Sequence, residues 1–302
     1  MGDQAQSLRD MVKKTVNDAA KPAKEVESDR GPASSAQPPV KVVTITSGKG
    51  GVGKSFLTVN LALALHQLDL KVLIIDADFG LSNVDVMLGM PARYNLSHLL
   101  NNKRSIEEIV QEWYGGIKFI SGGSGISELL RMNEAQLTKI IGDLSQLNAP
   151  IDIILCDTGA GVNETVLRIA SSSSETILVT TPEPTAIIDA YALLKTLSQN
   201  NDAPNIRLIM NKAVSLREAE NTINSFLGIA KKYLGKQIEP LGSILYDIDV
   251  DKSIKQQIPL LIAKPHSATA KDIVRIAETL IDLPAAEEPL GQLAKLFSRW
   301  IK

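Results

Sequence analysis

The sequence predicts an α/β domain built on a doubly wound, mainly parallel sheet, and three observations carry this prediction. An apolar, β-branched run at residues 40–46 leads into a glycine-rich loop, which an amphipathic helical pattern follows at residues 55–68. Later apolar runs alternate with helical patterns, as they do in right-handed β-α-β crossovers. Four of the five residues before Asp157 are apolar, which indicates a strand buried on both faces of a parallel sheet.

Length and composition restrict the class of protein. The chain has 302 residues, enough for one large α/β domain or two small ones, and its 44% hydrophobic content is that of a soluble globular protein. A net charge of −2 argues against a globally basic nucleic-acid binder, so no nucleic-acid partner is expected. No run reaches the roughly 18 apolar residues that span a bilayer. The polar N-terminus lacks a signal-peptide pattern, so a cytoplasmic protein is expected.

The single cysteine, Cys156, excludes a disulfide framework. Its place in an apolar strand pattern favours a buried structural thiol over a reactive one. An iron–sulfur scaffold is excluded as well, because a bridging cluster needs pairs of cysteines.

The glycine-rich loop has the form G-x-x-x-x-G-K-S between a predicted strand and a predicted helix. Its glycines allow left-handed dihedrals that turn successive N–H groups toward an anion, and the helix adds the positive end of its dipole. We expect Lys54 to reach the β- and γ-phosphates of a nucleotide and the Ser55 hydroxyl to bind Mg²⁺. A bare glycine turn is disfavoured because the whole motif stands in the required setting. The predicted nucleotide-binding residues in this loop are Gly48, Lys49, Gly50, Gly51, Val52, Gly53, Lys54 and Ser55.

Lys49 narrows the class, because an ordinary P-loop has no required lysine at that position. The stretch K-G-G-V-G-K-S resembles the MinD/ParA group of P-loop ATPases, which carry this signature lysine. The resemblance implies ATP as the nucleotide, sandwiched between the two subunits of an ATP-dependent homodimer. It also implies that Lys49 contacts the partner's phosphates, which makes Lys49 and Lys54 candidate catalytic residues.

Two carboxylates follow the next predicted strand, residues 71–76. Asp76 and Asp78 stand at its C-terminal end, where α/β sheets bind ligands. A spacing of two puts both on one side while the strand persists, so the residues alone indicate that one of them is catalytic. The resemblance implies that Asp78 orients or deprotonates the attacking water and that Asp76 supports Mg²⁺ and its waters. It also assigns Asn83 and Asp85 to the dimer and partner face.

The middle of the chain contains a third candidate carboxylate. Residues 93–115 predict two short helices with an exposed connection, residues 117–121 a short strand, and the stretch up to residue 147 a further helix. Asp157 then ends the buried strand and is the expected Walker B residue, which holds Mg²⁺ through water. The stretch D-T-G-A-G resembles the switch of the family, so a turn-forming Asp is a weak alternative.

The remaining core predicts strands at residues 176–180, 206–210 and 241–245 and helices at residues 186–198 and 216–234. Asn211, just past a strand end, matches the asparagine that contacts adenine in the family. An ordinary Asn cap remains an open alternative at this position. Glu183 faces the nucleotide or a partner, and the sequence assigns it no role.

The N-terminal segment predicts a short amphipathic helix at residues 1–20, followed by a linker at residues 21–39 that is rich in proline and has no apolar periodicity. The start of the chain resembles the D-Q-A-x-x-L-R element of the FlhG family, also called FleN or YlxH, whose members regulate flagellar number. In that family the element stimulates the GTPase FlhF; a frayed terminus is the alternative. The matching residues are Asp3, Gln4, Ala5, Leu8 and Arg9.

The C-terminal segment predicts a second amphipathic helix at residues 290–302, after a proline-containing linker at residues 283–289. Its basic side chains face away from the apolar ones, as in helices that lie on anionic membranes. Two such helices on an ATP dimer bind with avidity, which makes attachment nucleotide-dependent. A helix packed on its own domain is the alternative. The apolar face comprises Leu290, Leu293, Leu296, Phe297, Trp300 and Ile301.

The resemblance as a whole implies an FlhG-type ATPase, with its ATPase domain at residues 40–282 and ATP and Mg²⁺ as cofactors. Its expected partners are a second copy, FlhF and the inner face of the cell membrane, to which it binds reversibly. Family members also engage flagellar switch proteins or a flagellar transcription activator, and the sequence does not say which. A MinD-type division-site ATPase is the nearest alternative, a ParA-type partition protein a further one, and a pure nucleotide switch a non-enzymatic one.

Overall fold

The computed structural model of the chain describes residues 40–78, 83–123, 151–199 and 204–281. Four predicted features lie outside these residues: the N-terminal helix with its linker, the helical pattern that ends at residue 147, the linker at residues 283–289, and the C-terminal amphipathic helix.

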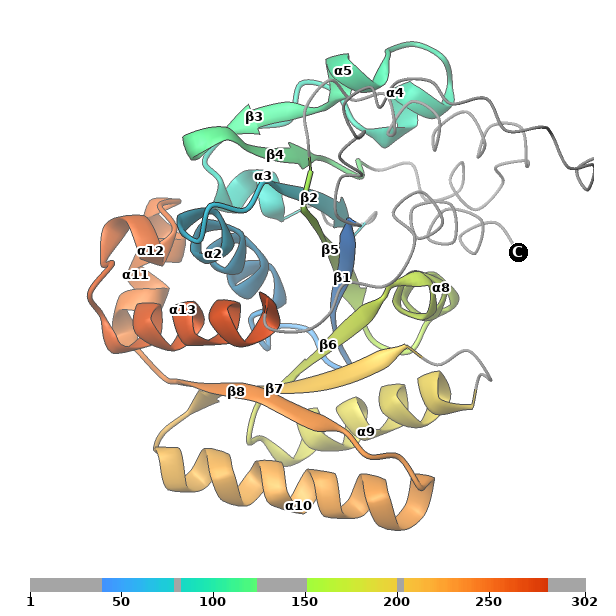
Figure 1. Cartoon of the computed structure of the whole chain (residues 1–302), viewed down its shortest axis with the longest axis vertical. Helices are drawn as coiled ribbons and strands as arrows, with labels where there is room; N and C mark the ends of the chain where they lie inside the picture. Colours follow the sequence, from blue (N-terminus) through green and yellow to red (C-terminus); the bar gives the residue numbers. More distant parts are fainter. Residues whose placement is uncertain (1–39, 79–82, 124–150, 200–203, 282–302) are drawn as a thin grey trace, which may run out of the picture. The chain divides into compact units, whose positions relative to one another are not determined.

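The described residues form an eight-stranded sheet in the order β3-β4-β2-β5-β1-β6-β7-β8 (Figure 1). Every neighbouring pair is parallel except β3 and β4, which are antiparallel. The predicted doubly wound, mainly parallel sheet is therefore confirmed. The strands are β1 (Lys41–Ser47), β2 (Val72–Ala77), β3 (Gln111–Trp113), β4 (Ile117–Ile120), β5 (Ile153–Ala160), β6 (Glu175–Thr180), β7 (Asn205–Ala213) and β8 (Glu239–Leu245).

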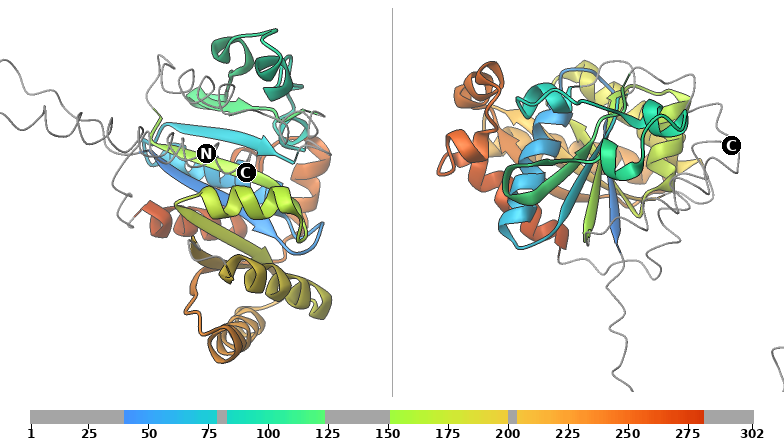
Figure 2. Two further views of the ribbon diagram at one scale, coloured as in Figure 1. Left: turned by 90° about the vertical axis from the view of Figure 1, so that its right-hand side faces the viewer. Right: turned by 90° about the horizontal axis from the view of Figure 1, so that it is seen from above.

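Helices cover both faces of this sheet (Figure 1), and Figure 2 shows the same layers from two further directions. One face packs on α2 (Lys54–Gln67) and α13 (Ala268–Ile281) through buried residues such as Ile45 and Ile74. The other face packs on α8 (Glu164–Ser172), α9 (Pro184–Ser198) and α10 (Leu216–Leu234). Alternate residues of the central strands thus serve opposite cores, which explains why these strands are mainly apolar, whereas the edge strands β3 and β8 are partly exposed. The short helices are α3 (Val84–Met87), α4 (Leu96–Leu100), α5 (Ile106–Ile109), α11 (Ile248–Gln256) and α12 (Leu260–Ala263).

The sequence did not predict several of these elements. The two short helices predicted within residues 93–115 are present as α4 and α5, but β3 follows them and pairs with β4 through a glycine turn at Gly115 and Gly116. A strand of three residues is too short for an alternating pattern to show. Helix α8 and the helices after β8 were also not predicted.

Cys156 lies in the centre of β5 and is fully buried. Burial raises the pKa of its thiol to about 12. The predicted buried structural thiol is confirmed.

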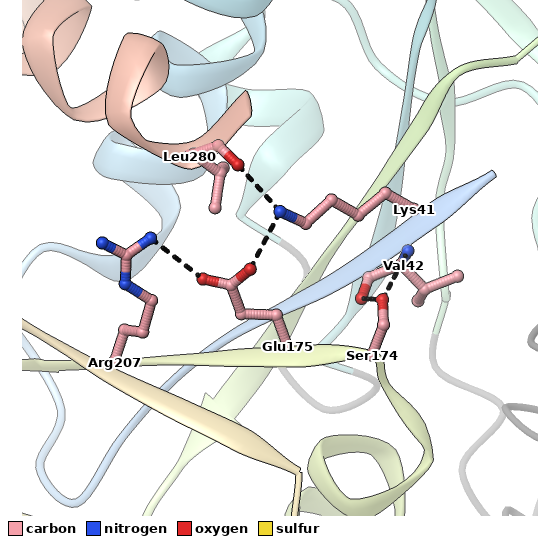
Figure 3. A network of polar contacts seen from close by, with 6 residues as sticks. All are labelled: Lys41, Val42, Ser174, Glu175, Arg207 and Leu280. Atoms are coloured by element: carbon pink, nitrogen blue, oxygen red, sulfur yellow. Dashed lines mark hydrogen bonds and ion pairs between the residues drawn. The ribbon is translucent and has the colours of Figure 1, made fainter. Parts of the chain in front are cut away.

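A buried ion cluster joins the N-terminal ends of three strands to the end of α13 (Figure 3). Lys41 of β1 lies 3.0 Å from Glu175 Oε2 of β6 and donates a hydrogen bond of 2.8 Å to the Leu280 carbonyl. The Arg207 guanidinium of β7 lies 3.5 Å from the other Glu175 oxygen. Beside this cluster, the backbone of Val42 exchanges two hydrogen bonds with the Ser174 hydroxyl. One buried carboxylate therefore serves two cations, the buried Arg207 and the partly buried Lys41, at the end of the sheet opposite the P-loop.

Replacing Glu175 with Gln is expected to lower the free energy of unfolding by about 2 kcal/mol, because Lys41 and Arg207 lose their shared buried anion. Urea denaturation of the nucleotide-free protein measures this change. The matched control is Glu239→Gln, at an exposed position at the start of β8, and it should change stability little. Equal stability of the two variants would contradict the expectation.

Candidate nucleotide-binding site

A cavity of about 960 Å³ opens at the C-terminal ends of the central strands. Its walls come from the P-loop, the ends of β2, β5 and β7, and the starts of α8 and α11. The parallel arrangement brings these segments to one edge, although they are far apart in the sequence. Side chains that line the cavity include Lys54, Ser55, Asp78, Asn83, Asn163 and Asn211.

The P-loop has the backbone conformation that its glycines were expected to allow. Gly51 and Gly53 have φ angles of 78° and 100°, and α2 begins at Lys54 directly after them. Lys54 is buried, with 8% of its surface exposed. Gly48 packs against α9, where an added Cβ would lie 2.1 Å from the carbonyl carbon of Asp189. The P-loop therefore leads directly into α2 and packs against α9, so there is no space for a side chain at Gly48.

The Lys49 side chain extends to the start of α9. Its Nζ donates hydrogen bonds to Glu183 Oε2 at 2.9 Å and to Thr185 Oγ1 at 2.8 Å. The hydrogen bond from Lys49 holds the pKa of Glu183 below its ordinary value. Glu183, which the sequence left without a role, therefore holds the signature lysine in this structure. The predicted contact of Lys49 with a partner's phosphates stays a prediction.

Asp76 and Asp157 lie side by side on β2 and β5, where they are register partners and fully buried. Thr58 donates a hydrogen bond of 3.0 Å to Asp157 Oδ1, while Asp157 Oδ2 has no hydrogen-bond partner among the described residues. Burial, and secondly the neighbouring Asp76 carboxylate, raise the pKa of Asp157 to about 7. Ser55, Lys54 and Thr58 oppose this rise. Carboxylate oxygens are preferred ligands of divalent cations, and here two buried carboxylates lie together, one of them with an oxygen that has no hydrogen-bond partner among the described residues. This donor set fits Mg²⁺.

The Asp76 carboxylate also organises the loop after β2. Its oxygens accept hydrogen bonds from the backbone N–H groups of Asp78 at 3.0 Å and of Asn83 and Val84 at 3.2 Å each. Strand β2 ends at Ala77, so Asp78 lies just outside it. The alternation of side chains along a strand therefore does not determine whether Asp78 faces the same side as Asp76. The Asp78 carboxylate faces Gly159, where an added Cβ would lie 3.4 Å from Asp78 Oδ1. Asp85 lies in the first turn of α3, next to Asn83 at the cavity.

Asn211 contacts the P-loop from the end of β7. Its Nδ2 donates a hydrogen bond of 2.7 Å to the Val52 carbonyl, and its Oδ1 accepts one of 2.9 Å from the Lys212 N–H. Ser215, and not Asn211, caps α10, so the alternative of an ordinary helix cap has no support here. Asn211 lies within β7, where the register breaks between Met210 and Ala213. Its contact with adenine stays a prediction.

Residues 39–281 match the model of the ParA family, described as an iron-transfer P-loop NTPase of the NUBPL type. The chain belongs to the MinD/ParA family of P-loop ATPases. Within this family it is 31% identical to the antiactivator FleN of Pseudomonas aeruginosa over 87% of this chain and 94% of FleN. It is 33% identical to the flagellum site-determining protein YlxH of Helicobacter pylori over 87% of this chain and 90% of YlxH.

Solved structures of the MinD/ParA family share the fold. The MinC:MinD complex of Aquifex aeolicus matches with a TM-score of 0.65 and 23% identity, covering 82% of this chain and 99% of that chain. MinD of Pyrococcus horikoshii, solved with Mg-ADP, matches with a TM-score of 0.64 and 24% identity over 80% and 96%. The predicted MinD/ParA fold and the resemblance to FleN and YlxH are confirmed by these matches. Among the described residues, no helix has the length and apolar content needed to cross a membrane.

Proposed function

We propose that this chain is an ATP-dependent, dimerising ATPase that regulates the number or placement of flagella. The observation that best supports the ATPase activity is the buried Asp157 oxygen, which has no hydrogen-bond partner among the described residues. It lies beside Asp76, at the site that also contains the complete P-loop. Mg-ADP in the related MinD of Pyrococcus horikoshii supports the same cofactors here. The flagellar role rests on the similarity to FleN and YlxH over most of the chain.

In the proposed site, the P-loop N–H groups and Lys54 hold the nucleotide phosphates. Ser55 and Asp157, with support from Asp76, would hold Mg²⁺, which neutralises charge on the phosphates. Asp78 orients the attacking water and accepts its proton. Its position against Gly159 links it to the D-T-G-A-G stretch, so that a movement of that stretch on binding changes the place of the carboxylate. Asn211 contributes the contact to adenine.

The dimer is proposed to form when ATP draws Lys49 toward the partner's phosphates. Lys49 would then leave Glu183 and Thr185 or carry them with it. An exposed ion pair of this kind contributes little stability, so its rearrangement costs little. Replacing Lys49 with Ala is expected to keep nucleotide binding and abolish the ATP-dependent dimer. Light scattering with ATP, and with ADP as the reference, tests this expectation.

The raised pKa of Asp157 makes Mg²⁺-dependent nucleotide binding sensitive to pH. A cation needs the ionised carboxylate, so it must displace a proton once the pH falls below about 7. The affinity for ATP with Mg²⁺ should fall as the pH is lowered from 8 to 6, approaching about tenfold per unit below the pKa. In the nucleotide-free protein the same carboxyl group has the opposite effect of pH on folding stability. The folded state keeps a proton between pH 4 and 7 that the unfolded state loses, so the contribution of Asp157 to stability falls as the pH rises.

Calorimetric titration of ATP at pH 6, 7 and 8, with Mg²⁺ and with EDTA, measures this dependence. Asp157→Asn should bind weakly at every pH with Mg²⁺ and should show no such slope. A wild-type affinity that is flat across this range would contradict the assignment of Asp157.

The finer proposals concern the two chain ends. The N-terminal segment, through Asp3, Gln4, Ala5, Leu8 and Arg9, would stimulate FlhF. The C-terminal segment would dock on anionic membrane with its apolar face, from Leu290 to Ile301. The protein would then be cytoplasmic and reversibly peripheral on the inner face of the cell membrane. Both proposals rest on sequence patterns typical of the family.

The test compares the GTP hydrolysis rate of FlhF alone, with the full chain, and with its Arg9→Ala variant. Stimulation that Arg9→Ala loses is expected for a flagellar regulator. Absence of stimulation would favour the division-site alternative represented by the MinD relatives. Sedimentation with anionic vesicles in ATP and in ADP tests the membrane proposal, with Trp300→Glu as the variant expected to stay in solution.

A further inference from the structure

Three carbonyl groups of the P-loop accept hydrogen bonds from side chains outside or at the edge of the loop. Ser47 Oγ donates to the Lys49 carbonyl at 2.8 Å. Asn211 Nδ2 donates to the Val52 carbonyl at 2.7 Å, and Lys212 Nζ donates to the Gly51 carbonyl at 2.8 Å. Two of these three donors are therefore consecutive residues of β7, about 160 positions further along the chain.

These contacts fix the directions of the loop's N–H groups. In a planar trans peptide the C=O of one residue and the N–H of the next point in opposite directions. Holding the Gly51 carbonyl outward therefore turns the Val52 N–H the other way, and holding the Val52 carbonyl does the same for the Gly53 N–H. Glycine peptides rotate easily, and Gly50 and Gly51 have no heavy atom near the positions of their missing side chains. The loop needs such donors to keep its N–H groups in one arrangement.

The backbone at Lys212 is adapted to this contact. Lys212 has a φ of 59°, in the left-handed region that non-glycine residues rarely adopt. The strand register breaks here, and Asn211 Oδ1 accepts the Lys212 N–H. This backbone conformation is unfavourable for lysine, and a surface lysine without a function would not require it. Unusual backbone of this kind is typically retained where a side chain must be aimed at a functional group.

We propose that Lys212 is a positioning residue of the nucleotide site. Its ammonium group clamps the Gly51 carbonyl so that the P-loop presents its N–H groups to the phosphates before the nucleotide arrives. It acts through the loop and not on the adenine, and it is distinct in role from Lys49 and Lys54. This inference rests on the proposed nucleotide site.

The experiment compares the full-length protein with Lys212→Met, Lys212→Arg and the control Lys231→Met, an exposed lysine in the last turn of α10. Displacement of a fluorescent ADP by ADP, ATP and inorganic triphosphate gives the affinities. Lys212→Met is expected to weaken all three by about tenfold, because a charged hydrogen bond to the loop is lost. Lys212→Arg should recover most of the affinity, and Lys231→Met should equal the unchanged protein. Melting temperatures without nucleotide should agree within the series.

Three outcomes would overturn the inference. Unchanged affinities in Lys212→Met would show that Lys212 does not position the P-loop, while the proposed nucleotide site would remain supported. Weaker ATP with unchanged triphosphate would move the effect of Lys212 to the base. A lowered melting temperature that Lys212→Arg fails to restore would make the residue merely structural. If the unchanged protein binds neither ADP nor ATP, the proposed function fails first, and with it the site on which the clamp acts.

Discussion

Asp78→Ala is expected to lower the rate of ATP hydrolysis by about 10²- to 10⁴-fold, the usual contribution of a positioned general base, while ATP binding changes little. The carboxylate lines the cavity beyond the end of β2, and its backbone N–H is held by Asp76. Asp78 belongs neither to the P-loop nor to the buried pair of Asp76 and Asp157, so the phosphate site should persist without its side chain. Phosphate release under saturating ATP measures the rate, and Glu112→Ala, at an exposed position on β3, is the matched control.

The same variant separates an ATPase from a pure nucleotide switch. If Asp78→Ala hydrolyses ATP at the normal rate, the assignment of Asp78 is wrong. If hydrolysis is lost while ATP-dependent dimerisation and the effect on FlhF persist, occupancy of the site is the signal and turnover only resets it.

Gly48→Ala is expected to weaken ATP binding by more than about a hundredfold, since overpacking against backbone costs about 3 kcal/mol. The added methyl group would lie 2.1 Å from the Asp189 carbonyl carbon and 2.2 Å from its oxygen, so the P-loop and α9 would have to separate. Because α9 also presents Thr185 to Lys49, that contact should be disturbed as well.

Gly228→Ala is the matched control, because it makes the same change at an exposed position of α10 where an added Cβ has no heavy atom within 4 Å. Calorimetry with ATP and circular dichroism should find a folded protein in both cases and a loss of binding in Gly48→Ala alone. Equal affinities of the two variants would show that the loop can move away from α9 freely.

The central strands and the P-loop were predictable because they depend on local signals. Continuous apolar runs predict parallel strands, and the ordered sequence of glycines before Lys54 and Ser55 predicts a phosphate loop. The shortest elements that were missed lack such signals, because β3 has three residues and α12 has four, too few to repeat a pattern. Helices α8 and α13 are longer, with 9 and 14 residues and one buried face each, so their sequences do carry a helical pattern that the prediction overlooked.

The sequence predicted which residues form the candidate site, but it did not predict the contacts that these residues make. Asp76, Asp78 and Asp157 each follow an apolar run, so the topology alone places them at one edge. The partner of Lys49 is Glu183, 134 residues away, and the sequence offers no sign of that pairing. Nor does any pattern in the sequence indicate that Lys212 takes a left-handed backbone, which coincides with the register break between Met210 and Ala213 of β7.

The burial of Cys156 has a practical consequence for spectroscopy. The chain contains no other cysteine, and a thiol with a pKa of about 12 in the middle of β5 reacts negligibly with maleimides at neutral pH. A cysteine introduced at an exposed position, such as Asn224 on α10, would then be the sole reactive thiol in an otherwise native sequence. Single-site spin or fluorophore labels can therefore follow nucleotide-driven distances in this protein without first removing a native residue.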